Sequence, residues 1–290
     1  MARVDGKVVG TAAMAFKDVG LLGQPRRAAF YFDLRVHPEH RNRGIGSRLT
    51  DEAVRLGGAR SDVGYWYVVG DNRALRGFTR SGHGTPVSGY TYLACPTYRE
   101  RPGRVDVRRS TMAEVHQRLL DTAPPFDFYT NPLVGGDVSA HVASWMTASL
   151  SSAAGCSVWD NSEILAEVVE AVPAGLRLAR GLFESRIFRG RPHPHVPEPG
   201  EQLRSWYLFD VFASEPGPVV DLVRFVSARA RESGIDYLYI PWVAGDEWVG
   251  AVKADLPRLF SPQIRYVFYC TDWGGRPREL RRIYVDIRDL

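Results

Sequence analysis

The chain has 290 residues, of which 44% are hydrophobic, and this is enough to build packed cores for one large domain or two ordinary ones. The net charge of +4 is modest and no run of five or six like charges occurs, which argues against a nucleic-acid partner. No apolar stretch approaches the ~20 residues that span a bilayer, and the first residues lack a signal-peptide pattern, so we expect a cytoplasmic protein without a membrane partner.

The expected elements begin with a β-hairpin. Asp5 and Gly6 predict a type I′ turn between a short strand and a longer one over 7–16. Residues 30–36 alternate apolar and polar side chains with the period of a half-buried strand. Residues 45–56 then repeat apolar side chains at helical spacing, and the two glycines that follow are interpreted as a left-handed helix stop.

The rest of the chain alternates strand and helix signals. The expected elements are a strand over 64–69, a short helix over 72–81, a strand over 85–95, a linker over 99–104, a strand near 104–108, helices near 111–121 and 138–150, strands within 156–172, and a proline-rich loop over 190–201.

The sequence contains an internal repeat. Residues 206–246 follow the order of residues 30–71, namely strand, turn, amphipathic helix, glycine stop, aromatic strand and Gly-Asp, and this aligns Asp33 with Asp210. Such a repeat indicates duplication of one supersecondary unit. The sequence therefore predicts an α/β fold with mixed sheets, arranged as two tandem domains over 1–103 and 104–290.

The turn RVHPEHRNRGIG, residues 35–46, joins the strand that ends at Val36 to the helix that begins at Ile45. A helix N-terminus offers unpaired N–H groups and about half a positive charge, which together favour a bound anion. Gly44 and Gly46 remove side chains from the first turn, and nearby arginines can add charge-assisted hydrogen bonds. The turn therefore predicts a phosphate-binding site.

The longer stretch VHPEHRNRGIGSRL, residues 36–49, resembles the acyl-CoA-binding signature of the GCN5-related N-acetyltransferase (GNAT) superfamily. The phrases GDNRALRGFTRSGH, CSVWDN and LFDVFASEPGPVVDLVRF resemble one branch of it, the tandem-domain HOOKLESS-type and histidine N-acetyltransferase-like proteins. This second similarity covers nearly the whole chain, but it is loose outside the CoA signature.

The resemblance implies acetyl-CoA as the cofactor. Main chain near Leu34 and Val36 would pair with the pantetheine arm like an added strand, and a backbone N–H of the same strand would polarise the thioester carbonyl. The implied cofactor-binding residues are Leu34, Val36, Arg41, Arg43, Gly44, Ile45, Gly46, Ser47, Arg48 and Asn72.

The resemblance also implies an acid and a base. Many relatives use a tyrosine to protonate the departing thiolate, but Phe78 occupies that position here; a thiolate whose thiol pKa is near ~8.5 can leave without it. Asp33 is the candidate catalytic base because it is the carboxylate on the signature strand. Its match to Asp210, in a copy without a cofactor signature, favours instead a structural role.

Two departures from the family are expected to matter. Relatives have a strand and two helices before the hairpin, and this sequence lacks them there, so the first domain is expected to be truncated at its N-terminus. In the second copy, Pro216, Val219 and Asp221 replace the arginine and the two glycines of the turn. The second domain is therefore expected to be degenerate, to bind no CoA and to help form the acceptor cleft.

No metal site is expected. His193 and His195 in the sequence PHPH lack a third ligand, and His37 and Glu39 are interpreted as solvated or close to the phosphate. The three cysteines are scattered and odd in number, which favours reduced core residues.

The sequence therefore predicts an enzyme, a GNAT-type N-acetyltransferase. It would move an acetyl group from acetyl-CoA to a primary amine of a small molecule, such as an amino acid or amine metabolite, by direct attack. Two alternatives remain open: a non-catalytic CoA-binding or scaffold protein, and a protein N-acetyltransferase. The sequence leaves the acceptor, the acyl chain length and the oligomeric state unspecified.

Overall fold

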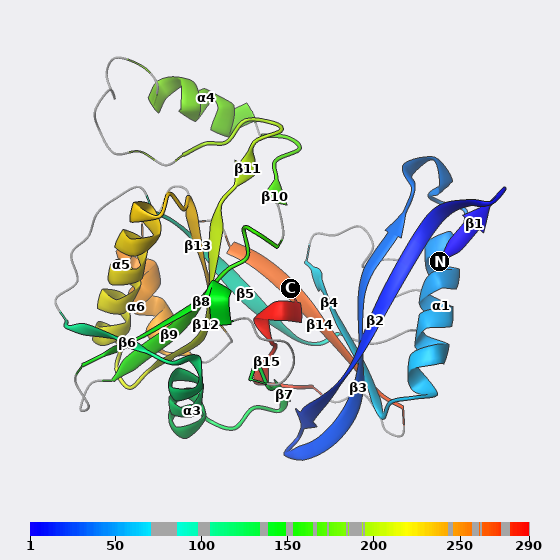
Figure 1. Ribbon diagram of the computed structural model, residues 1–290, viewed down its shortest axis with the longest axis horizontal. Helices are drawn as coiled ribbons and strands as arrows, with labels where there is room; N and C mark the ends of the chain where they lie inside the picture. The colour runs from blue at the N-terminus through cyan, green and yellow to red at the C-terminus, as the bar shows by residue number, and fades with distance from the viewer. Residues whose placement is uncertain are drawn as a thin grey trace. The chain divides into compact units, whose positions relative to one another are not determined.

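A computed structural model describes most of the chain (Figure 1). The described residues are 1–70, 86–97, 105–133, 139–148, 153–164, 167–172, 174–183, 185, 193, 195–242, 246–256, 261, 263–273 and 279–289. The helix expected over 72–81, the linker over 99–104 and the domain boundary after residue 103 lie outside them. Asn72 and Phe78 lie outside them as well.

The chain forms two compact units that interleave along the sequence. Unit 1 comprises Met1–Thr91, Pro125–Pro132 and Ile264–Leu290, and unit 2 comprises Tyr92–Pro124 and Leu133–Gln263. Three separate segments of the chain therefore build unit 1.

The sheet of unit 1 runs in the order β15-β7-β2-β3-β4-β14, with β1 paired to β2. Its elements are β1 (Ala2–Val4), β2 (Lys7–Leu21), β3 (Gln24–Val36), the 3₁₀ turn η1 (Pro38–His40), α1 (Ile45–Gly58), β4 (Val63–Val69), β7 (Phe128–Thr130), β14 (Gln263–Asp272), β15 (Ile283–Tyr284) and the 3₁₀ turn η3 (Ile287–Asp289). The strand β5 (Pro86–Pro96) is divided between the units after Thr91.

Two tight hairpins start the chain. Asp5 and Gly6 have φ angles of 48° and 78°, so the predicted type I′ turn is confirmed. Leu22 and Gly23, with φ angles of 50° and 76°, make a second such turn between β2 and β3. Both strands are longer than predicted because β2 runs to Leu21 and β3 begins before the alternating segment.

Helix α1 covers one face of this sheet and packs on β2, β3 and β4 (Figure 1). An added Cβ at Gly10 would lie 3.0 Å from Leu49 Cδ1, and one at Gly57 only 2.0 Å from the Tyr31 hydroxyl. The interpretation of Gly57 as a left-handed stop is wrong, because α1 continues through Gly58. Gly57 instead provides the space that the Tyr31 ring needs between helix and sheet.

Unit 2 has a sheet in the order β13-β12-β9-β8-β6. Its elements are β6 (Val107–Ser110), α3 (Met112–Thr122), the 3₁₀ turn η2 (Ser139–His141), β8 (Val142–Thr147), β9 (Ala154–Asp160), β10 (Glu167–Val168), α4 (Ala174–Phe183), β11 (Gln202–Leu203), β12 (Ser205–Ala213), α5 (Pro216–Glu232), β13 (Tyr237–Trp242) and α6 (Trp248–Asp255).

Unit 2 differs from the expectations at two places. The helix predicted near 138–150 is the short turn η2 followed by strand β8, which pairs antiparallel with both β6 and β9. Short apolar runs do not distinguish a buried strand from a buried helix by their period. Helix α4 lies in a segment for which the sequence analysis predicts no element.

Among the described residues, no helix has both the length and the apolar character that a membrane crossing requires.

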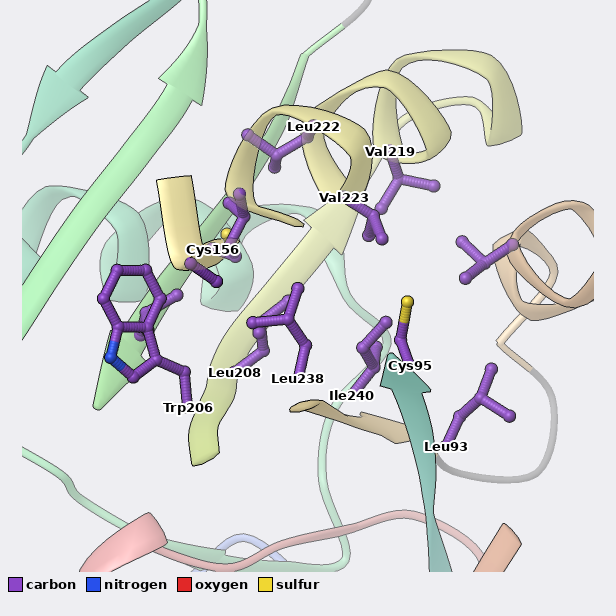
Figure 2. Packing of buried hydrophobic residues seen from close by; sticks show 14 of the residues in the cluster. Leu93, Cys95, Cys156, Trp206, Leu208, Val219, Leu222, Val223, Leu238 and Ile240 are labelled. Atoms are coloured by element: carbon purple, nitrogen blue, oxygen red, sulfur yellow. The ribbon is translucent and has the colours of Figure 1, made fainter. Parts of the chain in front are cut away.

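The core of unit 2 lies between its sheet and helices α5 and α6. Figure 2 shows Leu208, Leu238 and Ile240 from the strands facing Val219 and other apolar side chains of α5. These four side chains are at most 1% exposed. Burying a side chain of this size contributes about 1.5–3 kcal/mol, so the cluster stabilises this unit substantially.

The same β-α-β element occurs in both units, as β3-α1-β4 and as β12-α5-β13. In each, the two strands are parallel and pair over three residues only. The pairs join Ala28–Phe30 to Val63–Tyr65 in unit 1, and Ser205–Tyr207 to Tyr237–Tyr239 in unit 2. Beyond these residues, all of which are described, the strands separate. The mixed α/β fold class predicted from the sequence is confirmed.

A matching β-bulge strengthens the case for duplication. From Phe32 to Arg35, β3 advances by three residues while the paired segment of β2 advances by two, so β3 carries one extra residue. Strand β12 carries one extra residue opposite β9 in the same way. Asp33 and Asp210 lie in these bulges with φ angles of 53° and 51°. Aspartate tolerates this left-handed conformation better than most residues, which explains why both copies carry it.

A buried polar cluster holds the C-terminal segment of unit 1. Lys17 Nζ pairs with Asp289 Oδ1, and the Tyr65 hydroxyl donates a hydrogen bond of 2.7 Å to Asp289 Oδ2. Burial raises the pKa of Asp289, and the Lys17 ammonium opposes that rise. This cluster fixes η3 to strands β2 and β4.

We expect Lys17→Met to destabilise the protein by up to about 3–5 kcal/mol, because it leaves the Asp289 carboxylate buried without its cation. Urea denaturation measures this change. Lys7→Met, at an exposed position of the same strand, is the control and should change stability by no more than about 0.5 kcal/mol. Equal effects of the two substitutions would contradict the role assigned to the cluster.

Candidate functional site

The separation of β3 and β4 opens a cleft in unit 1. A cavity of about 200 Å³ lies at this position. Its lining residues are Ala12 and Ala13 from β2, Tyr31, Phe32, Asp33 and Leu34 from β3, Thr50, Ala53 and Val54 from α1, and Trp66, Tyr67 and Val68 from β4. Because β3 pairs with β2 along its other edge, the edge that faces the cleft keeps main-chain donors and acceptors for a ligand.

The bulge at Asp33 shapes the wall of this cavity. The Asp33 carboxylate pairs with the Arg35 guanidinium, and its side chain is 43% exposed. The structural role that the sequence favours for Asp33 is therefore not that of a buried core carboxylate. The side chain instead lies at the edge of the cavity, where a small ligand can reach it.

The turn after β3 is held by its own hydrogen bonds. His37 N–H donates to the Val9 carbonyl at 2.9 Å, and Arg41 Nε donates to the Val36 carbonyl at 3.1 Å. Asn42 and Gly44 have φ angles of 61° and 75°, so two residues of the turn adopt the left-handed conformation just before the helix begins. The turn thus has a defined shape without any ligand.

The N-terminus of α1 presents open donors. The first helical hydrogen bond runs from Arg48 N–H to the Gly44 carbonyl at 3.1 Å, so the N–H groups of Ile45, Gly46 and Ser47 have no acceptor within the helix. An added Cβ at Gly46 would touch only Val36 Cγ2, at 3.7 Å. The first turn therefore has room for an anion close to its main chain.

The structure brings most of the predicted cofactor residues together. Leu34 lines the cavity, Val36 ends the same strand, and one continuous turn carries Arg41, Arg43, Gly44, Ile45, Gly46, Ser47 and Arg48. Arg41, Arg43 and Arg48 are exposed, whereas Ile45 packs beside Gly10. Asn72 lies outside the described residues.

Sequence reasoning missed several cavity residues, above all Tyr31 and Trp66. Their rings make an edge-to-face contact with centroids 5.9 Å apart, on the face of the sheet that α1 covers. Burial raises the pKa of Tyr31 to about 12, so its hydroxyl stays protonated at neutral pH. The only sequence signal for Tyr31 is its place on one face of the alternating strand, and alternation does not tell whether that face meets solvent or a helix.

The N-terminus of α5 in unit 2 corresponds to that of α1 but lacks its open donors and its glycines. Helix α5 begins with Pro216, which has no N–H, and Glu215 precedes it as the N-cap residue. Asp221 is paired with Arg224 at 3.1 Å, and Val219 is fully buried in the core. A carboxylate at a helix N-terminus repels a phosphate, so unit 2 lacks the features that favour an anion in unit 1.

Comparison with known proteins identifies the fold of the first segment. Residues 1–84 match the acetyltransferase (GNAT) family. The N-terminal segment has the GNAT fold. No curated protein sequence matches the chain.

Solved structures extend the likeness to both units. The N-myristoyltransferase of Saccharomyces cerevisiae with bound myristoyl-CoA aligns with 94% of this chain and 69% of its own, at 10% identity and a TM-score of 0.55. A structure of that enzyme with myristoyl-CoA and inhibitors aligns with 94% and 67%, at 10% identity and a TM-score of 0.54. A GCN5-related N-acetyltransferase from Kribbella flavida aligns with 92% and 58%, at 12% identity and a TM-score of 0.46.

At these identities the likeness to the yeast enzyme concerns the fold, and the chain spans about two thirds of the yeast chain. The family match and the GNAT fold together support an acyltransferase.

Proposed function

We propose that unit 1 binds acetyl-CoA and transfers its acetyl group to a primary amine of a small molecule. The observation that carries this proposal is a continuous path along one strand. The cavity lies beside Phe32 and Asp33, the free edge of β3 continues to Val36, and the open donors of α1 follow within one short turn.

The proposed pose follows this path. The CoA diphosphate lies on the N–H groups of residues 43–48, where Arg41, Arg43 and Arg48 supply positive charge. The pantetheine arm pairs with main chain near Leu34 and Val36 as an added strand. The thioester then reaches the cavity. Asn72 stays in the proposed binding set through the family resemblance.

The proposed chemistry is direct transfer. A neutral amine attacks the thioester carbonyl, a C–N bond forms, the C–S bond breaks, and the amine loses one proton to a base or to water while CoA leaves as a thiolate. Covalent catalysis by cysteine does not fit, because Cys95, Cys156 and Cys270 are all buried. Burial also raises the pKa of Cys156 and Cys270, that of Cys270 to about 12.

The acceptor class rests on the branch resemblance. The tandem-domain HOOKLESS-type and histidine N-acetyltransferase-like proteins suggest a free amino acid or related amine. The second candidate is transfer to a protein N-terminus, and the fold likeness to N-myristoyltransferase over 94% of this chain supports it. A CoA-binding protein without activity is the third reading, since Phe78 has no proton to donate.

We expect Gly46→Ala to weaken CoA binding by at least about tenfold, because a methyl group enters the space proposed for the diphosphate. The substitution should leave the fold intact, since an added Cβ at Gly46 meets Val36 at an ordinary contact distance. The control is Gly217→Ala, at the second residue of α5, where an added Cβ meets nothing within 4 Å.

Titration calorimetry measures both variants. One CoA per chain is expected, with Gly217→Ala unchanged. Two CoA molecules per chain, or unchanged binding by Gly46→Ala, would contradict the proposed site.

Thiol release measures turnover. The protein is incubated with acetyl-CoA and a panel of amino acids, amine metabolites and peptides with free N-termini. We expect release that depends on a small amine. Release with peptides alone would support the protein acceptor, and CoA binding without any release would support the non-catalytic reading.

Two substitutions at Asp33 separate catalysis from structure. Asparagine also tolerates a positive φ, so we expect Asp33→Asn to keep the bulge and most of the turnover. Valine resists this conformation, so Asp33→Val should distort β3 and weaken CoA binding. Calorimetry and thiol release report the two effects. If Asp33→Asn binds CoA normally but releases no thiol, the carboxylate is the catalytic base.

A further inference from the structure

Three potential metal ligands meet in the turn between β3 and α1. His37, Glu39 and His40 each offer one ligand atom, and these atoms all lie within 4.8 Å of one another. Within the described residues, this is the one group of three such side chains that lie so close together.

The backbone of this turn places the three side chains. His40 N–H donates to the His37 carbonyl at 2.9 Å, and Arg41 N–H donates to the Pro38 carbonyl at 3.2 Å. In such a 3₁₀ turn, residues three apart lie on the same side, which brings His37 and His40 together. Pro38 restricts the backbone further, since its φ is fixed by the ring.

The ring of His40 has a polar atom without a partner. This atom, Nδ1, is buried and makes no hydrogen bond to any of the described residues. The His37 and His40 rings lie with their centroids 5.8 Å apart at an angle of 66°. A buried ring nitrogen without a partner costs about 1–3 kcal/mol, and a metal ion would satisfy it.

We propose that His37, Glu39 and His40 form a binding site for a divalent transition-metal ion. Metal–ligand bonds of about 2.0–2.1 Å place tetrahedral ligand atoms about 3.4 Å apart, so the three atoms must approach by a small amount. The exposed side chains of His37 and Glu39 can rotate to do so. Three protein ligands leave a fourth position for water or a ligand oxygen.

The ligand set selects the class of metal. Two imidazoles and one carboxylate suit Zn²⁺, Co²⁺ or Ni²⁺, whereas Mg²⁺ and Ca²⁺ prefer oxygen ligands alone. The site lies outside the proposed transfer cleft and does not depend on the transfer activity. It revises the expectations that the chain has no metal site and that His37 and Glu39 are solvated or close to the phosphate.

Calorimetry with Zn²⁺ and visible absorption with Co²⁺ test the site on the full chain, without an affinity tag and after removal of metals by chelation. We expect one tight site per chain and the absorption of Co²⁺ with low coordination number. His40→Gln and Glu39→Gln should each weaken binding by at least about 10- to 100-fold. Glu39 is exposed, so its substitution leaves the fold unchanged even if that of His40 does not.

The matched control is the double substitution His193→Gln and His195→Gln, which removes the two histidines of the sequence PHPH. It should leave the tight site unchanged. Absence of binding, unchanged binding by Glu39→Gln, or loss of the site in the double variant alone would each overturn the proposal.

Discussion

The short parallel pairing of β3 and β4 is the constraint on which the site depends. Three residue pairs hold the strands together at one end, and the bulge at Asp33 turns β3 away from the position that would continue the ladder. The free edge and the cavity both result from this separation. Because the same strand leads directly into the turn before α1, one geometric feature aligns the cavity with the helix N-terminus.

The aspartate in each bulge is best understood through the comparison of the two copies. Asp33 pairs with an exposed arginine, whereas Asp210 is buried and accepts a hydrogen bond of 2.8 Å from His116 of helix α3. Their surroundings differ, but their φ angles agree within 2°. The two aspartates share a backbone conformation but not their partners, which indicates that the bulge selects the residue type. A catalytic role of Asp33 would then come in addition to this structural one.

Local features could be predicted from the sequence. The turn at Asp5 and Gly6, strand β3 and helix α1 each follow from short-range patterns, and the glycines and arginines of the turn before α1 suggest the proposed anion site. Tertiary features could not. Strand β14 pairs with β4 although some 200 residues separate them. Pairing between strands so far apart in the chain leaves no signal in the local sequence. The place of Tyr31 beneath α1 is a second such feature, because strand alternation does not reveal which face a helix will cover.

The features that favour an anion in unit 1 are missing from the second copy for a geometric reason as well as an electrostatic one. Helix α5 has 17 residues and α1 has 14, although the flanking strands are equivalent. The three added residues amount to nearly one turn of helix. The segment between strand and helix is also shorter, with eight residues (37–44) before α1 and two (214–215) before α5, and Pro216 at the first position of α5 has no N–H to donate. Restoring the glycines alone would therefore not restore the site, since the coil itself is gone.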